Sequence, residues 1–466
     1  MKNHYLIFIC AAIYFCCTDA NKAYITFSGN IKNNNESILK VTNYNSSLKQ
    51  EIAIDSPGNF SGPVLVEKDG YYFFQVGRFY TTVRFKKGHN VDVSIDMDDF
   101  FKSISYSGDL KNINNYNVAK AQLRAKQVGN TKEYFVVRLN EFLPKIEKTR
   151  DTLFYLLQQS RLNGKDVDIE KKIIEYEYLQ TYNNYKKFYT YHKKIDPRLP
   201  ADYFEPVINM DIDDDEIFRY SRAYRNLIIE NYRLTSKKAL KENPKLSIID
   251  FVSSKTSSIK SLDIREQISS MLIRQMKEKN KNIESDYKRI MGLLSTKRMK
   301  DKLTQRYNSA KSTKTGLASV GFNYENYNGG MTSLKDLRGK LLYIDVWATW
   351  CGPCLIEMPD LSKLINEYSG KNIEFVSISI DSKNDYDKWR QMVKEKNIGG
   401  VHLYDSEGLN SNFMKAFSVG LIPRFMMIDA EGKIITATAP RPSSDNVRSF
   451  IDSYLEKPRV MKFTSN

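Results

Sequence analysis

Cysteine is scarce in this sequence: five of the 466 residues are cysteine, and three of these precede residue 18. The other two, Cys351 and Cys354, are separated by two residues. Such a close pair cannot cross-link distant parts of the chain, which excludes a fold held together by a disulfide framework. Histidine is also scarce and its four copies are scattered, so no metal site is expected.

No long hydrophobic run marks a membrane span near the N-terminus: the apolar residues 5–17 are too few for a bilayer, which takes about 20. The run follows Lys2 and precedes the small residue Ala20, an arrangement typical of a secretory signal. We therefore predict an export signal at residues 1–20 and a location in the periplasm or cell envelope. A lipid anchor on Cys16 or Cys17 and a buried first strand are the alternatives.

Acidic residues are fewer than basic ones, 55 against 71, and the net charge is +16. Residues 116–310 carry 39 basic and 26 acidic side chains, so +13 of the excess lies in the middle of the chain. Residues 182–194 interleave bases with aromatic side chains, as single-strand nucleic-acid binders do. No nucleic-acid motif accompanies them, so we interpret this stretch as a half-buried amphipathic helix and expect no nucleic-acid partner.

The length favours two or three domains, and 41% hydrophobic residues rule out wholesale disorder. Short β-branched and aromatic runs separated by turn signals at residues 23–110 predict an antiparallel β domain, either a sandwich or an open barrel. Residues 115–310 show helical periodicity, and no proline occurs between Pro244 and Pro353. The chain is thus predicted to begin with a signal peptide (residues 1–20), followed by a β-rich accessory domain (21–114) and a helical domain or connector (115–312). A C-terminal α/β domain (313–458) and a tail (459–466) complete the prediction.

Two motifs in the helical region have structural interpretations. The acidic run from Asp211 resembles the start of a calcium loop, but Glu216 occupies the sixth position, where glycine is needed. The run is better explained as the N-terminus of a helix, where the helix dipole favours negative charge. Asp263 and Glu266 have the spacing of a capping box for the helix that carries Ile264.

Strands and helices alternate after Gly316. Residues 341–347 and 373–380 read as buried strands, and residues 354–368 between them read as a helix. Two strands joined through a helix predict a parallel βαβ crossover. A hairpin at residues 425–438 and a closing helix at 447–455 complete the predicted α/β domain.

The chemistry-bearing motif is Trp-Cys-Gly-Pro-Cys, residues 350–354, where the first buried strand gives way to the helix. Cys351 at the first turn meets unpaired N–H groups and the positive end of the helix dipole, which favour its thiolate. Cys354 lies almost one turn further on the same side, within reach of Cys351. Gly352 and Pro353 separate the two, and Pro353 costs no helical hydrogen bond there. We therefore predict that Cys351 attacks and Cys354 resolves.

On this motif, residues 313–458 resemble the thioredoxin fold of the exported TlpA/ResA-like thiol–disulfide oxidoreductases. The resemblance implies that Asp345 exchanges a proton with the resolving thiol and that Glu357 lies near the site. It also implies a cis peptide bond before Pro423, with the backbone of Ile422 binding an extended substrate. The substrate-binding residues expected from the motif are Trp350, Gly352, Pro353, Ile422 and Pro423. The redox-active cysteine pair itself takes the place of a cofactor.

The fold class expected for the whole chain is a multidomain protein with an N-terminal antiparallel β domain, an α-helical middle segment and a C-terminal thioredoxin fold. Gly-Pro between the cysteines is the dipeptide of reducing thioredoxins, whose potential lies near about −270 mV. Reduction or isomerisation of disulfides in exported client proteins is therefore the predicted function. The resemblance further implies a membrane electron donor of the DsbD/CcdA type.

Two other functions compete with this prediction. A peroxiredoxin-like peroxide reductase would need Pro-x-x-x-Thr-x-x-Cys, but Ile344 and Ala348 occupy the proline and threonine positions. An envelope binding or assembly protein, in which the redox domain is auxiliary, is the other alternative, because most of the chain precedes residue 313.

Overall fold

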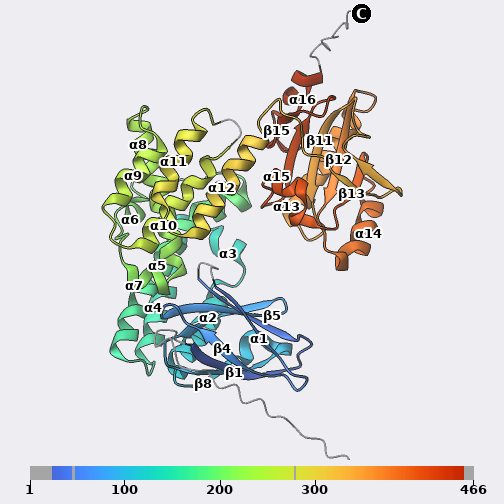
Figure 1. Ribbon diagram of the computed structural model, residues 1–466. Coiled ribbons are helices and arrows are strands. Elements are labelled where there is room, and N and C mark those ends of the chain that lie inside the picture. The colour runs from blue at the N-terminus through green and yellow to red at the C-terminus, as the bar shows by residue number, and fades with distance from the viewer. Residues whose placement is uncertain (1–23, 45–47, 278–279, 456–466) are drawn as a thin grey trace, which may run out of the picture. The chain divides into compact units, whose positions relative to one another are not determined.

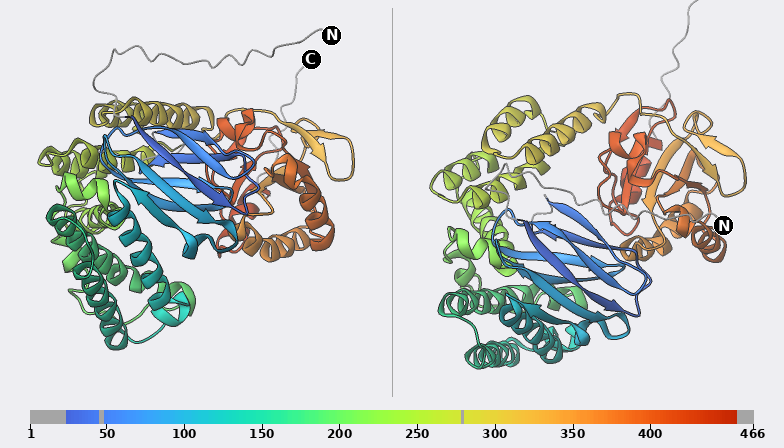
Figure 2. Two further views of the ribbon diagram at one scale, coloured as in Figure 1. Left: turned by 90° about the horizontal axis from the view of Figure 1, so that it is seen from below. Right: turned by 60° about the horizontal axis from the view of Figure 1, so that its bottom comes forward.

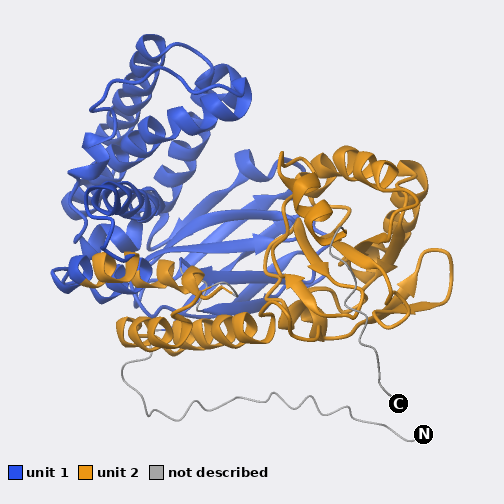
Figure 3. Cartoon of the chain, turned by 90° about the horizontal axis from the view of Figure 1, so that it is seen from above, with its two compact units in different colours: residues 1–247, 254–268 blue, residues 248–253, 269–466 orange. Residues whose placement is uncertain are grey.

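The computed structural model describes residues 24–44, 48–277 and 280–455 (Figure 1). They form two compact units (Figure 3): unit 1 holds residues up to 247 together with 254–268, and unit 2 holds 248–253 together with 269 onward. The predicted signal at 1–20, with its cysteines, and the predicted tail at 459–466 lie outside the described residues. No helix within the described ranges is both long and apolar enough to cross a membrane.

Unit 1 begins with two four-stranded sheets, ordered β4-β1-β7-β8 and β3-β2-β5-β6. The strands are β1 (Tyr24–Lys32), β2 (Ile38–Asn43), β3 (Lys49–Ala53), β4 (Asn59–Leu65), β5 (Gly70–Val76), β6 (Phe79–Phe85), β7 (Val91–Asp96) and β8 (Ser105–Gly108). The ring of Phe27 in the first sheet lies 5.5 Å from that of Phe74 and 5.1 Å from that of Phe85 in the second. The two sheets therefore share one apolar core, which confirms the predicted β domain as a sandwich.

One strand pair of the sandwich departs from the antiparallel prediction. β1 and β7 are parallel, with Phe27 opposite Val91. Parallel neighbours need a long crossover connection rather than a tight turn. Here the chain between them forms β4 and the whole second sheet before it returns, which supplies that crossover.

Helices occupy the middle of the chain, as predicted. They are α1 (Phe100–Ser103), α2 (Lys111–Val128), α3 (Thr131–Phe135), α4 (Leu139–Gln158), α5 (Gly164–Lys193), α6 (Glu205–Ile208), α7 (Asp215–Tyr220), α8 (Arg222–Glu242), α9 (Ile248–Ser257), α10 (Leu262–Ser270), α11 (Ile283–Leu293) and α12 (Lys297–Ser312). On α5, Tyr185 is 1% exposed and donates a hydrogen bond to the Val137 carbonyl, while Tyr182 stacks on Tyr203 with ring centroids 4.4 Å apart. Tyr182 and Tyr185 of the stretch 182–194 thus pack inside unit 1, whereas Tyr191 is exposed.

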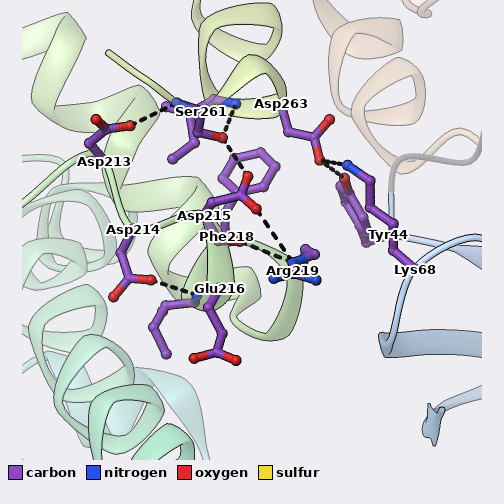
Figure 4. A network of polar contacts seen from close by, with 12 residues as sticks. Tyr44, Lys68, Asp213, Asp214, Asp215, Glu216, Phe218, Arg219, Ser261 and Asp263 are labelled. Carbon is purple, nitrogen blue, oxygen red and sulfur yellow. Dashed lines mark hydrogen bonds and ion pairs between the residues drawn. The ribbon is translucent and has the colours of Figure 1, made fainter. Parts of the chain in front are cut away.

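The acidic run after Asp211 begins helix α7, as predicted (Figure 4). The Asp214 carboxylate caps this helix by accepting the N–H of Ile217 at 3.0 Å and pairs with Lys172 at 2.7 Å. The Asp213 carboxylate accepts the backbone N–H groups of residues 260 and 261 at 2.9 and 3.0 Å. These oxygens therefore join segments of unit 1 to one another.

The predicted capping box at Asp263 is wrong. Ser261 caps α10, because its hydroxyl accepts the N–H of Ile264 at 3.3 Å. The Asp263 carboxylate instead accepts hydrogen bonds from the Tyr44 hydroxyl at 3.0 Å and from the Lys68 ammonium at 2.6 Å (Figure 4). Lys68 and Tyr44 of the β domain thus bind the Asp263 carboxylate, which the sequence spacing had predicted to cap the helix.

Unit 2 is built on a seven-stranded sheet with the order β10-β9-β13-β12-β11-β14-β15. Its strands and helices are β9 (Asn323–Asn326), β10 (Met331–Ser333), β11 (Leu341–Trp347), α13 (Gly352–Glu367), β12 (Ile373–Ser379), α14 (Tyr386–Lys396), β13 (Val401–Tyr404), α15 (Asn412–Ala416), β14 (Arg424–Ile428), β15 (Ile434–Thr436) and α16 (Val447–Leu455). β11 and β12 are parallel and joined through α13, so the βαβ crossover is confirmed. β14 and β15 form the predicted antiparallel hairpin.

Helices cover both faces of this sheet (Figure 2). Alternate residues of β11 serve two cores, because side chains alternate along a strand. Ile344 packs in the core that contains Trp389 of α14, and Tyr343 packs in the core that contains Leu361 of α13 and Ile451 of α16. By the same alternation, Asp345 projects from the face of β11 that carries Tyr343.

Candidate active site

The cysteine pair lies at the start of α13. Cys351 and Cys354 form a disulfide bond with their Cα atoms 5.2 Å apart. Cys351 is the N-cap residue, and the backbone N–H of Cys354 donates a hydrogen bond to its sulfur at 3.2 Å. That N–H and the helix dipole stabilise negative charge on the Cys351 sulfur once the disulfide is reduced. The sequence prediction that Cys351 meets the helix N-terminus is confirmed.

The turn that leads into Cys351 is anchored by a residue that sequence reasoning missed. The Asp381 carboxylate, 1% exposed, accepts the backbone N–H of Thr349 at 3.0 Å and the Thr349 hydroxyl at 2.8 Å. Ser379, the last residue of β12, donates its hydroxyl to the same carboxylate at 2.7 Å. The end of β12 therefore holds the turn before the cysteine pair. The signal in the sequence was an aspartate directly after a buried strand.

Asp345 is a buried acid on the strand that precedes the motif. It is 6% exposed and forms no ion pair with any described residue. Burial, and to a smaller extent the negative charge of Glu357, together raise the pKa of Asp345 to about 8. Among the described residues, its Oδ1 atom finds no hydrogen-bond partner. Asp345 therefore exchanges its proton at a much higher pH than an exposed aspartate does.

Glu357 lies on the first half of α13 and is also buried. Its Oε2 atom accepts the backbone N–H of Ser443 at 3.1 Å, and its Oε1 atom accepts the Ser443 hydroxyl at 3.1 Å and an Arg441 N–H at 3.3 Å. The carboxylate thus ties the active-site helix to the loop before α16. It acts on Asp345 through its charge, so the expectation that Glu357 lies near the site agrees with the electrostatics.

The Ile422–Pro423 peptide bond is cis, as the resemblance implied. The next residue, Arg424, begins β14 and lies opposite Val346 of β11. Ile422 packs against the core cluster that contains both cysteines. The chain therefore brings Pro423 to the end of β11, where the turn toward Cys351 starts.

Exposed apolar side chains flank the cysteine pair. Trp350 is 57% exposed, whereas Trp347 is buried at 1%. Trp350 directly precedes Cys351 in the sequence, so its exposed ring lies next to the cysteine pair. Leu421, two residues before Pro423, is 87% exposed. Exposed apolar side chains thus lie next to Cys351 and close to Pro423 in the sequence.

No group of three or more His, Cys, Asp or Glu side chains in the described part of the chain is arranged to hold a metal ion. The sulfur pair, the two buried acids and the cis-proline segment lie at or next to the start of α13. A parallel βαβ unit with a disulfide at the N-terminus of its helix, together with a cis-proline directly before the neighbouring strand β14, defines a thioredoxin-fold thiol–disulfide oxidoreductase.

Comparison with known proteins agrees with this class. Residues 317–451 match the Redoxin family model. The thiol–disulfide oxidoreductase ResA of Bacillus cereus is 27% identical over 142 residues, which cover 30% of this chain and 77% of ResA. The thioredoxin-like protein YneN of Bacillus subtilis is 30% identical over 120 residues, which cover 26% of this chain and 68% of YneN. The thioredoxin domain of a Bacteroides vulgatus thiol–disulfide oxidoreductase is 20% identical, with a TM-score of 0.28 and coverage of 30% of this chain and 97% of that domain.

The chain therefore belongs, through its C-terminal domain, to the thioredoxin-like thiol–disulfide oxidoreductases of the ResA and TlpA type. It carries additional N-terminal domains, because the β sandwich and most of the helices precede the matched residues.

Proposed function

We propose that this protein reduces or isomerises disulfide bonds in exported client proteins. The observation that carries the proposal is the Cys351–Cys354 disulfide at the N-terminus of α13, where the Cys354 N–H is aimed at the Cys351 sulfur. This geometry favours a thiolate at Cys351 and keeps the second sulfur within reach of any mixed disulfide formed there.

The reaction proceeds in two exchanges. The Cys351 thiolate attacks one sulfur of the client disulfide, a mixed disulfide forms, and the other client sulfur leaves as a thiolate that takes up a proton. Cys354, after losing its proton, attacks the Cys351 sulfur, and the second client thiolate leaves and is protonated. The client gains two electrons and two protons, and the Cys351–Cys354 disulfide is restored.

Asp345 is proposed to accept the proton of Cys354 in the second exchange. A general base works best when its pKa lies near the working pH and near that of its partner. The pKa of Asp345 is raised to about 8 by burial, close to the ordinary value of a thiol, about 8.5. Glu357 is proposed as a positioning residue, because its charge contributes to the pKa of Asp345 while its oxygens hold the loop at 441–443.

Client binding is proposed to use the surface around the disulfide. Trp350 and the Gly352–Pro353 pair would contact the client on one side, and Ile422 and Pro423 on the other. The backbone of Ile422 would bind an extended client segment in the manner of a strand, which depends little on the client's sequence.

We further propose that the protein acts in the periplasm or cell envelope, after export by residues 1–20 or while anchored through a lipid on Cys16 or Cys17. An oxidising compartment would leave the pair as a disulfide after each turnover. A membrane dithiol donor of the DsbD/CcdA type would then return Cys351 and Cys354 to the reduced state.

Insulin reduction tests the proposed chemistry. With dithiothreitol as the electron source, the protein should accelerate cleavage of the insulin interchain disulfides and the resulting precipitation, and a Cys351→Ser/Cys354→Ser double variant should not. Failure of the wild-type protein would overturn the proposal. Consumption of peroxide in a parallel assay would favour a peroxide reductase, and full biological function of the double variant in cells would favour the binding or assembly role.

A further inference from the structure

A cavity of about 360 Å³ lies in unit 2 beside the segment that carries Pro423. Helix α12 forms one wall with Arg306 and Thr313, and the cis-proline segment forms the other with Phe417, Ser418 and Arg424. Lys277 lies at its edge and is exposed. The Ser309 hydroxyl of α12 donates a hydrogen bond to the Ala416 carbonyl at 2.5 Å, which fixes the two walls against each other.

The cavity is positively charged. Lys277, Arg306 and Arg424 line it, and no carboxylate is among its lining residues. In the described part of the chain Arg306 forms no ion pair, and its one hydrogen bond, to the Ser418 carbonyl, is long at 3.4 Å. Arg424 donates to the Phe417 carbonyl at 3.2 Å, so both guanidinium groups are directed to the same short segment. Arginine presents a planar fork of N–H donors that matches a carboxylate.

The cavity begins next to the site of chemistry. Arg424 directly follows Pro423, so their Cα atoms are about 3.8 Å apart. Phe417, on the same wall, packs in the core cluster that contains Cys351 and Cys354. A client segment lying along Ile422 would therefore come close to Arg424, a lining residue of the cavity, within a few residues of its reacting cystine.

We propose that this cavity binds an acidic side chain of the client polypeptide, close in sequence to the cysteine under attack. The inference rests on the proposed function and adds a substrate class to it: disulfides flanked by aspartate or glutamate. The volume exceeds what one carboxylate side chain needs, and apolar wall residues such as Phe417 and Ala310 suit its methylene groups while the cations take the charge.

Matched peptides test the inference. Disulfide-bonded peptide pairs with glutamate close to the cysteine, on its N-terminal or C-terminal side, are compared with the same peptides carrying glutamine. The wild-type protein should reduce the better glutamate peptide with a kcat/KM about tenfold higher than its glutamine counterpart. This preference should shrink as the salt concentration rises, because screening weakens the attraction.

Two variants locate the source of the preference. Arg306→Gln should lower the ratio of acidic to neutral kcat/KM to about twofold, and Lys277→Gln, at an exposed position that tolerates substitution, should lower it to about fivefold. Arg306→Lys should keep part of the preference, because it keeps the charge but loses the fork. Lys394→Gln on α14 removes an exposed cation that does not line the cavity and should leave the ratio as in the wild type.

The peptide assay distinguishes failure of the acidic-substrate preference from failure of the proposed disulfide reduction. If the wild-type protein reduces neither peptide, the proposed function fails. If it reduces both equally well, the function stands and the acidic preference is overturned. A preference that survives in both Arg306→Gln and Lys277→Gln would show that the cavity is not its source. Saturable binding of sulfate without any peptide preference would make the cavity a small-anion site and would also overturn the inference.

Discussion

Each unit of the molecule contains a buried carboxyl group, Glu170 in unit 1 and Asp345 in unit 2, and the two differ in the partners that compensate their charge. Glu170 in unit 1 is fully buried and accepts hydrogen bonds from Lys120 at 2.5 Å and from the Tyr71 hydroxyl at 2.8 Å. Asp345 in unit 2 is almost as buried, yet it has no cationic partner among the described residues and one oxygen without a hydrogen bond. A compensated charge holds structure in place, whereas an uncompensated acid takes up a proton that it can exchange.

The same contrast extends to the surroundings of the two acids. In unit 1 the acidic run at 213–215 is taken up by helix capping and by Lys172. In unit 2 the buried Asp381 is also compensated, but its partners are the backbone and hydroxyl of the turn that carries the cysteine pair. These acidic side chains therefore stabilise the fold of unit 1, whereas in unit 2 Asp381 positions the turn that carries the cysteine pair.

The largest effect is expected at the sulfur that attacks. Cys351→Ser should lower insulin reduction by at least about 1000-fold, to the rate of dithiothreitol alone, because no other thiolate can begin the exchange. Cys354→Ser should keep the first attack and lose turnover. Stopped-flow mixing with a model disulfide under single-turnover conditions separates the two. An equally fast first phase in both variants would contradict the assigned order.

In unit 1, Lys120→Met should destabilise the fold strongly without touching the chemistry. It leaves Glu170 buried without its cation, which typically costs about 3–5 kcal/mol. Urea denaturation followed by far-UV circular dichroism measures the loss, and insulin reduction under native conditions measures activity.

The control is the double variant Lys120→Met/Glu170→Leu, which removes both charges and should recover most of the lost stability. If Lys120→Met instead reduced the rate of disulfide exchange in a fully folded protein, the division between a structural and a chemical buried acid would be wrong.

In unit 2, Asp345→Asn should change how stability depends on pH. The folded-state pKa of Asp345, about 8, is raised above its ordinary value of 3.8, so the folded protein binds this proton more tightly than the unfolded chain. The contribution of Asp345 to stability is therefore greatest at low pH and falls as the pH rises from about 4 to about 8. Relative to Asp345→Asn, the wild type should lose about 4 kcal/mol between pH 5 and pH 8.

Asp445→Asn, at an exposed position of the same unit, is the matched control and should follow the wild-type pH profile. In single-turnover kinetics at neutral pH, Asp345→Asn should slow the second exchange more than the first. Identical pH profiles of stability for Asp345→Asn and the wild type would mean that Asp345 is as well compensated as Glu170.

The smallest effect is expected at the anchored turn. Thr349→Val removes the hydroxyl bond to Asp381 and should cost about 1–3 kcal/mol of stability, with a few-fold slower attack by Cys351. Thr349→Ser keeps the hydroxyl and should restore the rate. A rate unchanged by Thr349→Val at the same pH would reduce this contact to a purely structural one.

The C-terminal α/β domain could be predicted from the sequence, because its central strands are almost entirely buried and mostly apolar. The apolar run of β11, the C-x-x-C motif at the start of α13 and the segment around Pro423 could be placed because each pattern has few structural solutions. In the sandwich the sequence predicted strands but not their pairing: the parallel neighbours β1 and β7 lie more than 60 residues apart, and nothing local in the sequence marks them as partners.

Contacts between distant segments could not be predicted. Thr349 and Asp381 are 32 residues apart and meet only because β11 and β12 are parallel and in register. Asp263 carries a local capping signal, yet its carboxylate is taken by Tyr44 and Lys68, which lie in another part of unit 1. Propensity and spacing predict which local hydrogen bonds a side chain can form. Partners from distant segments determine which of these bonds form in the folded protein.

Capture of client proteins tests the central claim most directly. Cys354→Ser expressed in its native cells should accumulate mixed disulfides with client proteins through Cys351, visible as high-mass bands on non-reducing gels that disappear on reduction. We expect many such bands for Cys354→Ser and none for the double variant Cys351→Ser/Cys354→Ser. Equal band patterns for the two variants, or no bands for Cys354→Ser, would contradict it.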